Sequence, residues 1–314
     1  MDSMRRLIQI LIILLCLALL AGMTVMIFRY RAEARTRAAQ ISALSAQARE
    51  YESELMRLRR EQEVQEMQLY TPEGPGAAIV AFRIGDEETL EAAVAYGEAY
   101  GFTPSVIVNV DEENAAALLE TLADRGLDII FGCNTFSNRT ETALRAMTEK
   151  AENAGCSITS SFLLRAGDDN EENRKTLKRA GVTTLFLYGD VLSSTVSDDF
   201  TELNYSYISR SGYNPSSRLS DLRGSEQGLL FAVDLVETTV TERQTEEILS
   251  LIREEQNAGH IVLSSVSGAA LTVQDRVDHE RQRVEEFLAV QETRSARIAE
   301  LEETIREIYS HWDD

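Results

Sequence analysis

The side chains most suggestive of a chemical site lie in residues 132–138, Gly-Cys-Asn-Thr-Phe-Ser-Asn. This stretch follows an apolar run, residues 127–131, that predicts a buried strand, so Asn134 and Asn138 are expected at the carboxyl end of that strand. Amides form hydrogen bonds readily, but an amide carbonyl is a poor ligand for zinc, which takes imidazole, thiolate or carboxylate. The stretch therefore predicts polar contacts without a metal.

The central part of the chain alternates between predicted strands and helices. Gly101, Gly126, Gly155, Gly181 and Gly259 each follow a predicted helix closely, as C-cap glycines do. This alternation predicts an α/β fold with a mainly parallel sheet, either a barrel or a doubly wound sheet, with any site at the carboxyl ends of the strands. The predicted strands are residues 77–82, 105–110, 127–131, 158–164, 184–188, 229–235 and 261–264, and the predicted helices are residues 87–100, 112–125, 140–153, 171–179 and 242–257.

Residues 75–270 resemble the polysaccharide deacetylases of the NodB homology, or carbohydrate esterase 4, type. The zinc-binding motif of that family, His-Thr-x-Ser-His, matches residues 134–138, but Asn134 and Asn138 replace its two histidines. The resemblance implies a distorted (β/α) barrel. It also implies descent from enzymes that remove acetyl groups from chitin-like, peptidoglycan or exopolysaccharide chains.

The other motifs of the family are also altered. The first, Thr-Phe-Asp-Asp-Gly, matches residues 81–85, where Arg83 replaces the catalytic-base aspartate and Ile84 replaces a zinc ligand. The third, Arg-Pro-Pro-Tyr-Gly, matches a segment ending at Gly167 that keeps little more than a Phe and a Gly. The Leu-x-His motif, which supplies a catalytic histidine, matches residues 228–234, where Asp234 comes last and histidine is missing.

These losses bear on the expected function, because deacetylation needs a metal to polarise the carbonyl and a base to take a proton from water. The matched positions retain neither, so we expect no catalytic residue, no metal and no cofactor. Arg83, Asn134, Asn138 and Asp234 are then candidates for binding a ligand in the former cleft. The expected function is a binding or scaffold pseudoenzyme of the cell envelope or of exopolysaccharide handling, and the alternative is a cryptic hydrolase with relocated active-site residues.

The N-terminus predicts a membrane anchor. Residues 7–28 are apolar and uncharged, and this length spans a hydrocarbon core of about 30 Å as a helix. Because the apolar run is longer than that of a typical signal peptide, we favour an uncleaved single-pass anchor. More arginines follow the segment than precede it, so the positive-inside rule slightly favours a cytoplasmic C-terminal side. Short N-terminal tails often stay inside, however, and the family resemblance favours an extracytoplasmic C-terminal domain, which is the orientation we expect.

Two long helices are predicted around the central domain. Apolar residues recur at alternating spacings of three and four over residues 41–69 and again over residues 277–312, as in a coiled coil. The second helix could return along the first as an antiparallel stalk, and the alternatives are a parallel homodimer through residues 41–69 or a helix that packs on the domain. The expected domains are residues 1–29 (anchor), 30–71 (stalk), 72–271 (deacetylase-like domain) and 272–314 (C-terminal helix).

Charge and cysteine content exclude several classes of function. The formal net charge of −21 argues against nucleic acid or anionic lipid as the main partner. The expected partners are the membrane through residues 7–28, an envelope polysaccharide as the resemblance implies, and a second copy of the chain through the coiled coil. Cys133 and Cys156 could pair, but their spacing indicates no disulfide framework. With three histidines in the chain, a Cys/His zinc cluster is not expected.

Other polar clusters have simple structural interpretations. Residues 86–88 and 168–172 each open a predicted helix, where carboxylates favour the N-terminal end of the helix dipole. Asp198 and Asp199 lie in a polar loop and are a weak signal. Tyr205, Tyr207 and Tyr213 lie in a Ser- and Asn-rich stretch, residues 203–217, which is either an irregular connection or a surface for stacking sugars.

Overall fold

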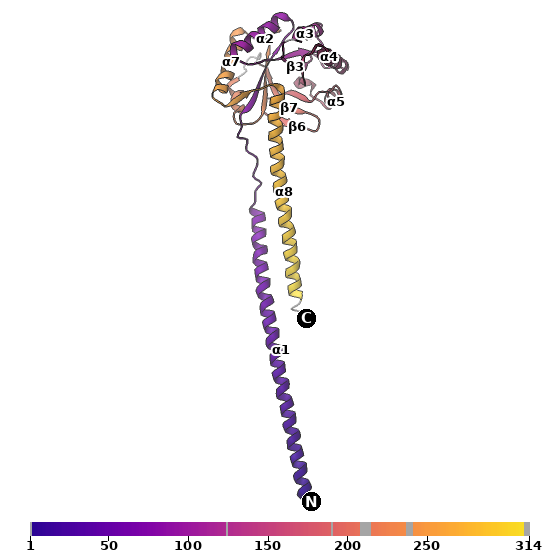
Figure 1. Cartoon of the computed structure of the whole chain (residues 1–314), viewed down its shortest axis with the longest axis vertical. Coiled ribbons are helices and arrows are strands. Elements are labelled where there is room, and N and C mark those ends of the chain that lie inside the picture. Colours follow the sequence, from indigo (N-terminus) through magenta and orange to yellow (C-terminus); the bar gives the residue numbers. More distant parts are fainter. Residues whose placement is uncertain (1, 124, 190, 208–214, 237–240, 311–314) are drawn as a thin grey trace. The chain divides into compact units, whose positions relative to one another are not determined.

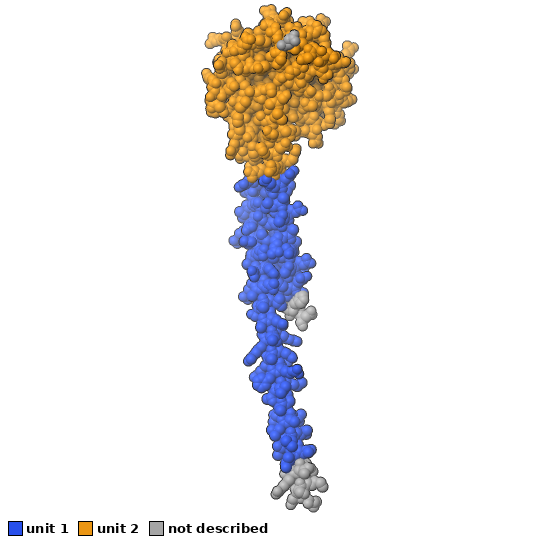
Figure 2. Space-filling view, viewed as in Figure 1, with its two compact units in different colours: residues 1–68, 284–314 blue, residues 69–283 orange. Residues whose placement is uncertain are grey.

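The computed structural model describes residues 2–123, 125–189, 191–207, 215–236 and 241–310. The chain divides into two compact units (Figures 1 and 2). Unit 1 contains residues 1–68 and 284–314, and unit 2 contains residues 69–283.

Unit 2 is built on a closed barrel of seven parallel strands. Strand β1 pairs with β8 on one side and with β2 on the other, and this second pairing closes the ring. The expected (β/α) barrel is therefore confirmed, and the doubly wound sheet is excluded. In order around the ring, the strands are β1 (Gly76–Arg83), β2 (Ser105–Asn109), β3 (Asp128–Gly132), β4 (Ser157–Leu164), β5 (Thr184–Tyr188), β7 (Thr201–Tyr207) and β8 (Gly228–Asp234). At the margin, β9 (Ile261–Leu263) pairs parallel with β1, and β6 (Thr195–Val196) pairs antiparallel with β7.

Helices surround the barrel, because every second strand residue points outward and is apolar (Figure 1). Phe82, Phe131, Phe162 and Phe231 belong to this outer core and are at most 2% exposed. The five glycines expected at C-caps all have positive φ. Gly101 and Gly155 are the caps themselves, and Gly181 and Gly259 each follow the cap by one residue. Gly126 lies four residues after its helix, which ends at Leu122 rather than at residue 125. The elements are α2 (Glu87–Tyr100), α3 (Ala115–Leu122), α4 (Thr140–Ala154), η1 (Ala166–Asp168), α5 (Glu171–Arg179), α6 (Pro215–Leu222) and α7 (Glu242–Asn257).

The inward-facing residues fill the barrel, and the last helix closes its amino-terminal end. Helix α8 (Val266–Ser310) begins six residues before the expected boundary at residue 272. Its first turns place Val266, Ala269 and Val273 in the same buried cluster as Ala77 at the start of β1. This burial stabilises the early start even though Gly268 is a weak helix former.

Strand β7 corrects the expectation of an irregular connection over residues 203–217. Its sequence, Thr-Glu-Leu-Asn-Tyr-Ser-Tyr, is too polar to be recognised as a buried strand, yet it pairs with both β5 and β8. Tyr205 is 2% exposed and packs edge-on against Tyr188 inside the barrel. It is therefore not available to stack on a sugar, and Tyr213 lies outside the described residues.

Unit 1 contains helix α1 (Asp2–Val64) and the later part of α8. Polar contacts join the two helices in antiparallel order: Tyr309 donates to Glu52, Arg59 donates to Glu302, and Gln62 donates to Ser295. Leu301 and Ile308 are buried between these contacts, and Ala48, which precedes them in α1, is also buried. Helix α1 ends at Val64, before the Pro- and Gly-containing segment expected to end it, and the expected seam residue Leu69 is 73% exposed.

Helix α1 is long and apolar enough to cross a membrane. From Ile10 onward it contains an 18-residue window with a mean hydropathy of 3.0, none of which is buried. A signal sequence near the N-terminus has the same properties. The apolar helix is thus established, while the uncleaved anchor and its orientation remain predictions.

Candidate functional site

Strand register brings the polar candidates together at the carboxyl end of the barrel. Arg83 ends β1 and pairs in register with Asp234, which ends β8. Asn109 ends β2 and pairs with Gly132 at the end of β3, two residues before Asn134. Along β1, the interior residues Ala77, Ile79 and Ala81 are apolar, and Arg83 continues their alternation. A polar layer therefore covers the apolar barrel interior.

Arg83 lies at the centre of this layer. Its Nη1 donates to Oδ2 of Asp234 at 2.8 Å, and its Nη2 donates to Oε1 of Glu112 at 2.7 Å. The Nη2 atom also donates to the Asn134 side-chain oxygen at 3.2 Å. The Arg83 and Asp234 side chains are each 7% exposed, whereas that of Glu112 is 22% exposed. The cluster is thus an ion pair buried on one side and open to solvent on the other.

Two amide side chains complete the cluster. The Asn109 amide donates to Oε1 of Glu112 and to the Asn134 side-chain oxygen, both at 3.0 Å. The Asn134 amide donates to the same Glu112 oxygen at 3.1 Å. One carboxylate oxygen of Glu112 therefore accepts hydrogen bonds from Arg83 and from both amides.

The loop after β3 is held in place by two further side chains. The Asp111 carboxylate accepts hydrogen bonds from the backbone N–H groups of Asn134, at 2.9 and 3.0 Å, and of Thr135, at 3.0 Å. From the end of β4, Arg165 donates to the Asn134 carbonyl at 2.7 Å and to its side-chain oxygen at 3.2 Å. These contacts fix the orientation of the Asn134 amide toward Arg83 and Glu112.

The electrostatics favour a charged Arg83 throughout the physiological pH range. Burial opposes the charge, but the hydrogen bond to Glu112 and the charge of Asp234 outweigh it and raise the pKa of Arg83 above its ordinary value. Beside the site, burial, supported by the charges of Asp111 and Asp168, raises the pKa of the Cys133 thiol to about 12. Cys133 is therefore a thiol at neutral pH, and it forms no disulfide with Cys156.

The residues present do not fit a zinc ion. The guanidinium of Arg83 carries a positive charge at the position matched to the catalytic-base aspartate, and Ile84 is fully buried in the outer apolar core. The Asn134 oxygen already accepts hydrogen bonds from Arg83, Asn109 and Arg165. In the part of the chain that the structure describes, no group of three or more His, Cys, Asp or Glu side chains could hold a metal.

Three of the four candidate residues meet in this cluster, and the fourth does not. Asn138 is exposed, and among the described residues it makes no hydrogen bond to Arg83, Asn134 or Asp234. Sequence reasoning missed Asn109, Glu112, Asp111 and Arg165. The available signal was their position, because each lies within two residues of the carboxyl end of a predicted strand.

The acidic clusters away from the cleft have structural roles. Asp86 caps α2 and accepts a hydrogen bond from the Thr89 backbone N–H at 2.8 Å, as expected. Asp169 and Glu202 bind Arg174 at 2.6 and 2.7 Å, and Asp199 forms an ion pair with Lys178. These carboxylates do not form a second site.

Comparison with known proteins leaves the activity open. No family model and no curated protein matches the chain. Among solved structures, the Xyl-CE4 domain of a multidomain xylanase from the hindgut metagenome of Trinervitermes trinervoides is 14% identical, over 62% of this chain and 89% of that one, with a TM-score of 0.38. A protein from Mycobacterium smegmatis described as a polysaccharide deacetylase is 12% identical, over 64% and 98%, with a TM-score of 0.37.

A third similar structure has a different named activity. A protein from Coccidioides immitis described as a fructose-bisphosphate aldolase is 10% identical, over 66% of this chain and 89% of that one, with a TM-score of 0.33. At these identities and TM-scores the likenesses assign no activity to this chain. The barrel itself is established by its strand pairings.

Proposed function

We propose that this chain is a single-pass, membrane-anchored binding or scaffold module of the cell envelope, and that the carboxyl end of its barrel performs no hydrolysis. The observation that carries this proposal is the Arg83 cluster. A buried guanidinium, held by Asp234, Glu112 and Asn134, lies where a hydrolase of the resembled family would keep its base and metal. The residues that remain are suited to a fixed polar structure.

The two carboxylates of the cluster are poorly suited to act as a general base. A base must be free to accept a proton from water or substrate within hydrogen-bond reach. One oxygen of Glu112 accepts three hydrogen bonds, and Asp234 is bound by Arg83 and by the Val236 backbone N–H. Protonation of either carboxylate would remove its negative charge and so weaken its charge-assisted contact with Arg83.

The anchor and the charge distribution support a place at a membrane surface. Residues 7–28 are the proposed anchor, and the barrel would lie on the extracytoplasmic side, where envelope polysaccharide is a candidate ligand. An acidic domain is not drawn to an anionic lipid surface, so the anchor would have to supply the membrane attachment. A protease added to intact cells or spheroplasts should digest the barrel; protection of the barrel until lysis would place it in the cytoplasm.

One observation favours the alternative of a cryptic hydrolase. The Glu112 side chain is 22% exposed, and it lies in a cluster with Arg83 and Arg165, which could stabilise an anionic intermediate. In that case Glu112 would be the reactive carboxylate. The binding module has no turnover, whereas the cryptic hydrolase would hydrolyse a substrate and would depend on Glu112.

The deciding experiment measures metal content and hydrolysis on the full-length protein in detergent. We expect far less than one zinc per chain and no hydrolysis of an acetylated chromogenic ester above the level of the Glu112→Gln variant. Stoichiometric zinc, together with activity lost on chelation, would overturn the proposal. Activity that is independent of metal but absent in Glu112→Gln would establish the cryptic hydrolase.

A second experiment separates glycan binding at this end from a purely structural role. On a glycan array, binding by the full chain that is lost in Asn134→Ala but retained in Asn138→Ala would assign a sugar site to the cluster. The two asparagines make a matched pair, because Asn134 belongs to the cluster and Asn138 is exposed outside it. Equal binding by both variants would leave the cluster as a structural element.

A further inference from the structure

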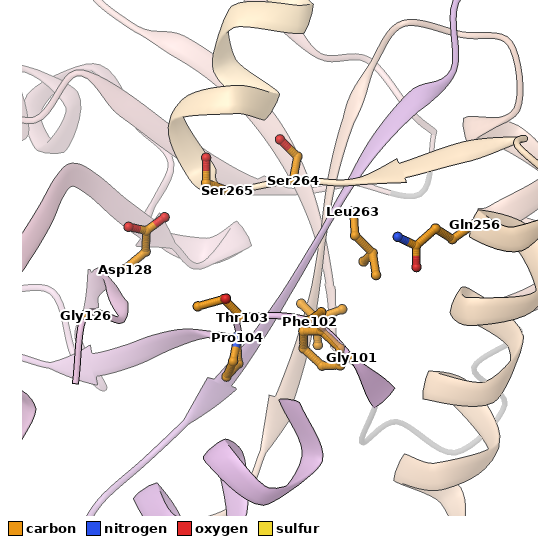
Figure 3. Close-up of a pocket in the computed structure, with 11 residues that line it drawn as sticks. Gly101, Phe102, Thr103, Pro104, Gly126, Asp128, Gln256, Leu263, Ser264 and Ser265 are labelled. Atoms are coloured by element: carbon orange, nitrogen blue, oxygen red, sulfur yellow. The ribbon is translucent and has the colours of Figure 1, made fainter. Parts of the chain in front are cut away.

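Unit 2 has a pocket (Figure 3) at the amino-terminal side of the barrel, opposite the Arg83 cluster. This pocket has a volume of about 390 Å³. Its walls come from the loop between α2 and β2, the loop between α3 and β3, the end of α7, and the turn from β9 into α8. In a parallel barrel such loops lie at the end away from the Arg83 cluster, so the two sites are separate.

The strand register explains why a pocket forms there. Strand β1 pairs with β2 only through Ala81, Phe82 and Arg83, near its carboxyl end, and with β9 only through residues 76–78. Between these pairings Val80 contributes to the pocket wall. Strand β2 therefore pairs with the carboxyl end of β1 and β9 with its amino end, and the gap between β2 and β9 is bordered by loops.

The pocket carries hydrogen-bonding groups with spare capacity. In the described part of the chain, the hydroxyls of Thr103 and Ser264 and the amide of Gln256 have no intramolecular hydrogen bond. One oxygen of Asp128 accepts a hydrogen bond from Ser157 at 3.1 Å, which leaves the other available. The Ser265 hydroxyl accepts a hydrogen bond from the Gly268 backbone N–H at 3.1 Å and keeps its own proton to donate.

The charges around the pocket favour a neutral ligand. Asp128 is the one charged group among the described residues that line the pocket, and it disfavours an anion. Ser265 caps the first turn of α8, so the positive end of a helix dipole lies at the same wall and offsets part of the attraction of Asp128 for a cation. Phe102 and Leu263, both half-buried, supply an apolar surface beside the polar groups.

From this geometry we propose that the pocket binds a small, neutral, polyhydroxylated molecule of the size of one or two sugar rings. Hydroxyls of such a ligand can donate to Asp128 and exchange hydrogen bonds with Thr103, Ser264 and Gln256, while its C–H faces pack on Phe102. The volume is near the lower end of the range of about 300–1,000 Å³ for small-molecule sites. This inference is independent of the function proposed for the Arg83 cluster.

In the test, the full-length protein in nanodiscs is titrated with four probes. Saturation-transfer NMR and calorimetry measure the binding of each probe. The neutral probes are glucose and cellobiose, and their charged counterparts are glucosamine and glucuronate. We expect a neutral probe to bind at least about tenfold more tightly than either charged one, a difference of about 1.4 kcal/mol. Absence of binding by both neutral probes, or a preference for a charged probe, would overturn the proposal.

Two variants locate the binding. Thr103→Trp fills the pocket from an exposed position and should abolish binding, and Asp128→Asn should weaken it by about tenfold through loss of a charged acceptor. Asp198→Asn, an exposed carboxylate outside the pocket, is the matched control and should bind as the natural chain does. Circular dichroism verifies that each variant is folded. Unchanged binding in folded Thr103→Trp would refute the site.

Discussion

Arg83 is a single buried side chain that organises the polar contacts at the carboxyl end of the barrel. It is 6% exposed, and its charge is matched by Asp234, which is buried to a similar extent, and by the more accessible Glu112. A buried ion pair contributes little net stability by itself, but removal of one partner leaves a buried charge uncompensated. The cluster is thus sensitive to single changes and tolerant of paired ones.

The first prediction tests this asymmetry. Arg83→Met should lower the free energy of unfolding by about 3–5 kcal/mol, because Asp234 stays buried without its cation. The double variant Arg83→Met/Asp234→Leu should recover most of that loss. Urea denaturation of the full chain in detergent, followed by circular dichroism, measures both effects.

The control for this prediction is Arg243→Met, which changes an exposed arginine at the start of α7. Its effect should stay within about 0.5 kcal/mol. If Arg83→Met were equally mild, or if the double variant were no more stable than the single one, the buried ion pair would not determine the stability of this end.

The site was predictable to the extent that its residues follow apolar strands. Arg83, Asn134 and Asp234 each end or closely follow such a strand, and register then brings them together. Glu112 escaped notice because it begins the predicted helix 112–125 rather than ending a strand. Its contact with Arg83 depends on the pairing of β1 with β2, which a single sequence does not reveal.

At the scale of elements, α2 combines a polar cap with a glycine that permits close packing. Asp86 and Thr89 form a reciprocal capping box at its start. The hydrogen bonds from Thr89 lower the pKa of Asp86 below its ordinary value. The carboxylate therefore stabilises the folded barrel above the pKa of Asp86 in the unfolded chain, and this stabilisation is lost as pH falls through the depressed folded value.

The second prediction follows from that cap. Asp86→Ala should cost about 1 kcal/mol of stability at pH 7, and the difference from the natural chain should shrink as the pH falls through the depressed pKa of Asp86. Asp86→Asn is the matched control, because it keeps the acceptor oxygen but does not titrate. Thermal unfolding over a pH series measures both; an Asp86→Ala deficit that is constant with pH would contradict the role of the charge.

The third prediction concerns Gly97, where alanine should lower the stability although helix propensity alone would raise it. A Cβ at this position would lie 2.6 Å from Cδ of Pro104 and 2.7 Å from the Phe102 carbonyl oxygen. Alanine gains about 1 kcal/mol of propensity over glycine in a helix, but such overpacking against a loop costs about 1–3 kcal/mol. We therefore expect Gly97→Ala to be destabilising in urea denaturation.

The comparison for Gly97 lies in the same helix. Ala95 is exposed, so Ala95→Gly should show the propensity cost alone, about 1 kcal/mol. A stabilised Gly97→Ala protein would mean that the α2–β2 loop can move away from the helix. That loop also borders the pocket at the amino-terminal side of the barrel, so the result shows whether this part of the pocket wall is rigid.

Some strands could be predicted from the sequence and others could not, because some are stabilised by their own apolar residues and others by contacts with neighbouring elements. Strands β1 and β8 are continuous apolar runs, and both were predicted to within a residue or two. Strand β7 carries Asn204 and Ser206, both buried, and Asn204 accepts a hydrogen bond from the Ser193 backbone N–H at 2.7 Å. Its strand conformation depends on two neighbouring strands and a loop, so local periodicity gives no sign of it.

At the scale of the molecule, the contacts of unit 1 favour a helical hairpin over a parallel homodimer. The fourth prediction is that Gln62→Cys/Ser295→Cys, in a Cys16→Ala background, forms a disulfide within one chain on mild oxidation. The natural side chains at these positions lie 3.4 Å apart, Nε2 to Oγ. Electrophoresis without reductant distinguishes a faster-migrating monomer from a crosslinked dimer.

The control pair for the hairpin is Arg60→Cys/Ser295→Cys, because Arg60 is exposed and makes no contact with Ser295. It should crosslink much more slowly. Crosslinking between chains in the Gln62 pair, with none within a chain, would support the homodimer through residues 41–69 and contradict the hairpin.

The way α8 closes the barrel has a consequence for how the protein is made. Strand β1 is synthesised early, but the barrel interior is complete only when Val266, Ala269 and Val273 have been added. Helix α1 leaves the ribosome long before that point, so any insertion of α1 into a membrane would precede barrel folding. A nascent chain arrested before residue 266 should remain protease-sensitive, because its barrel is open at one end.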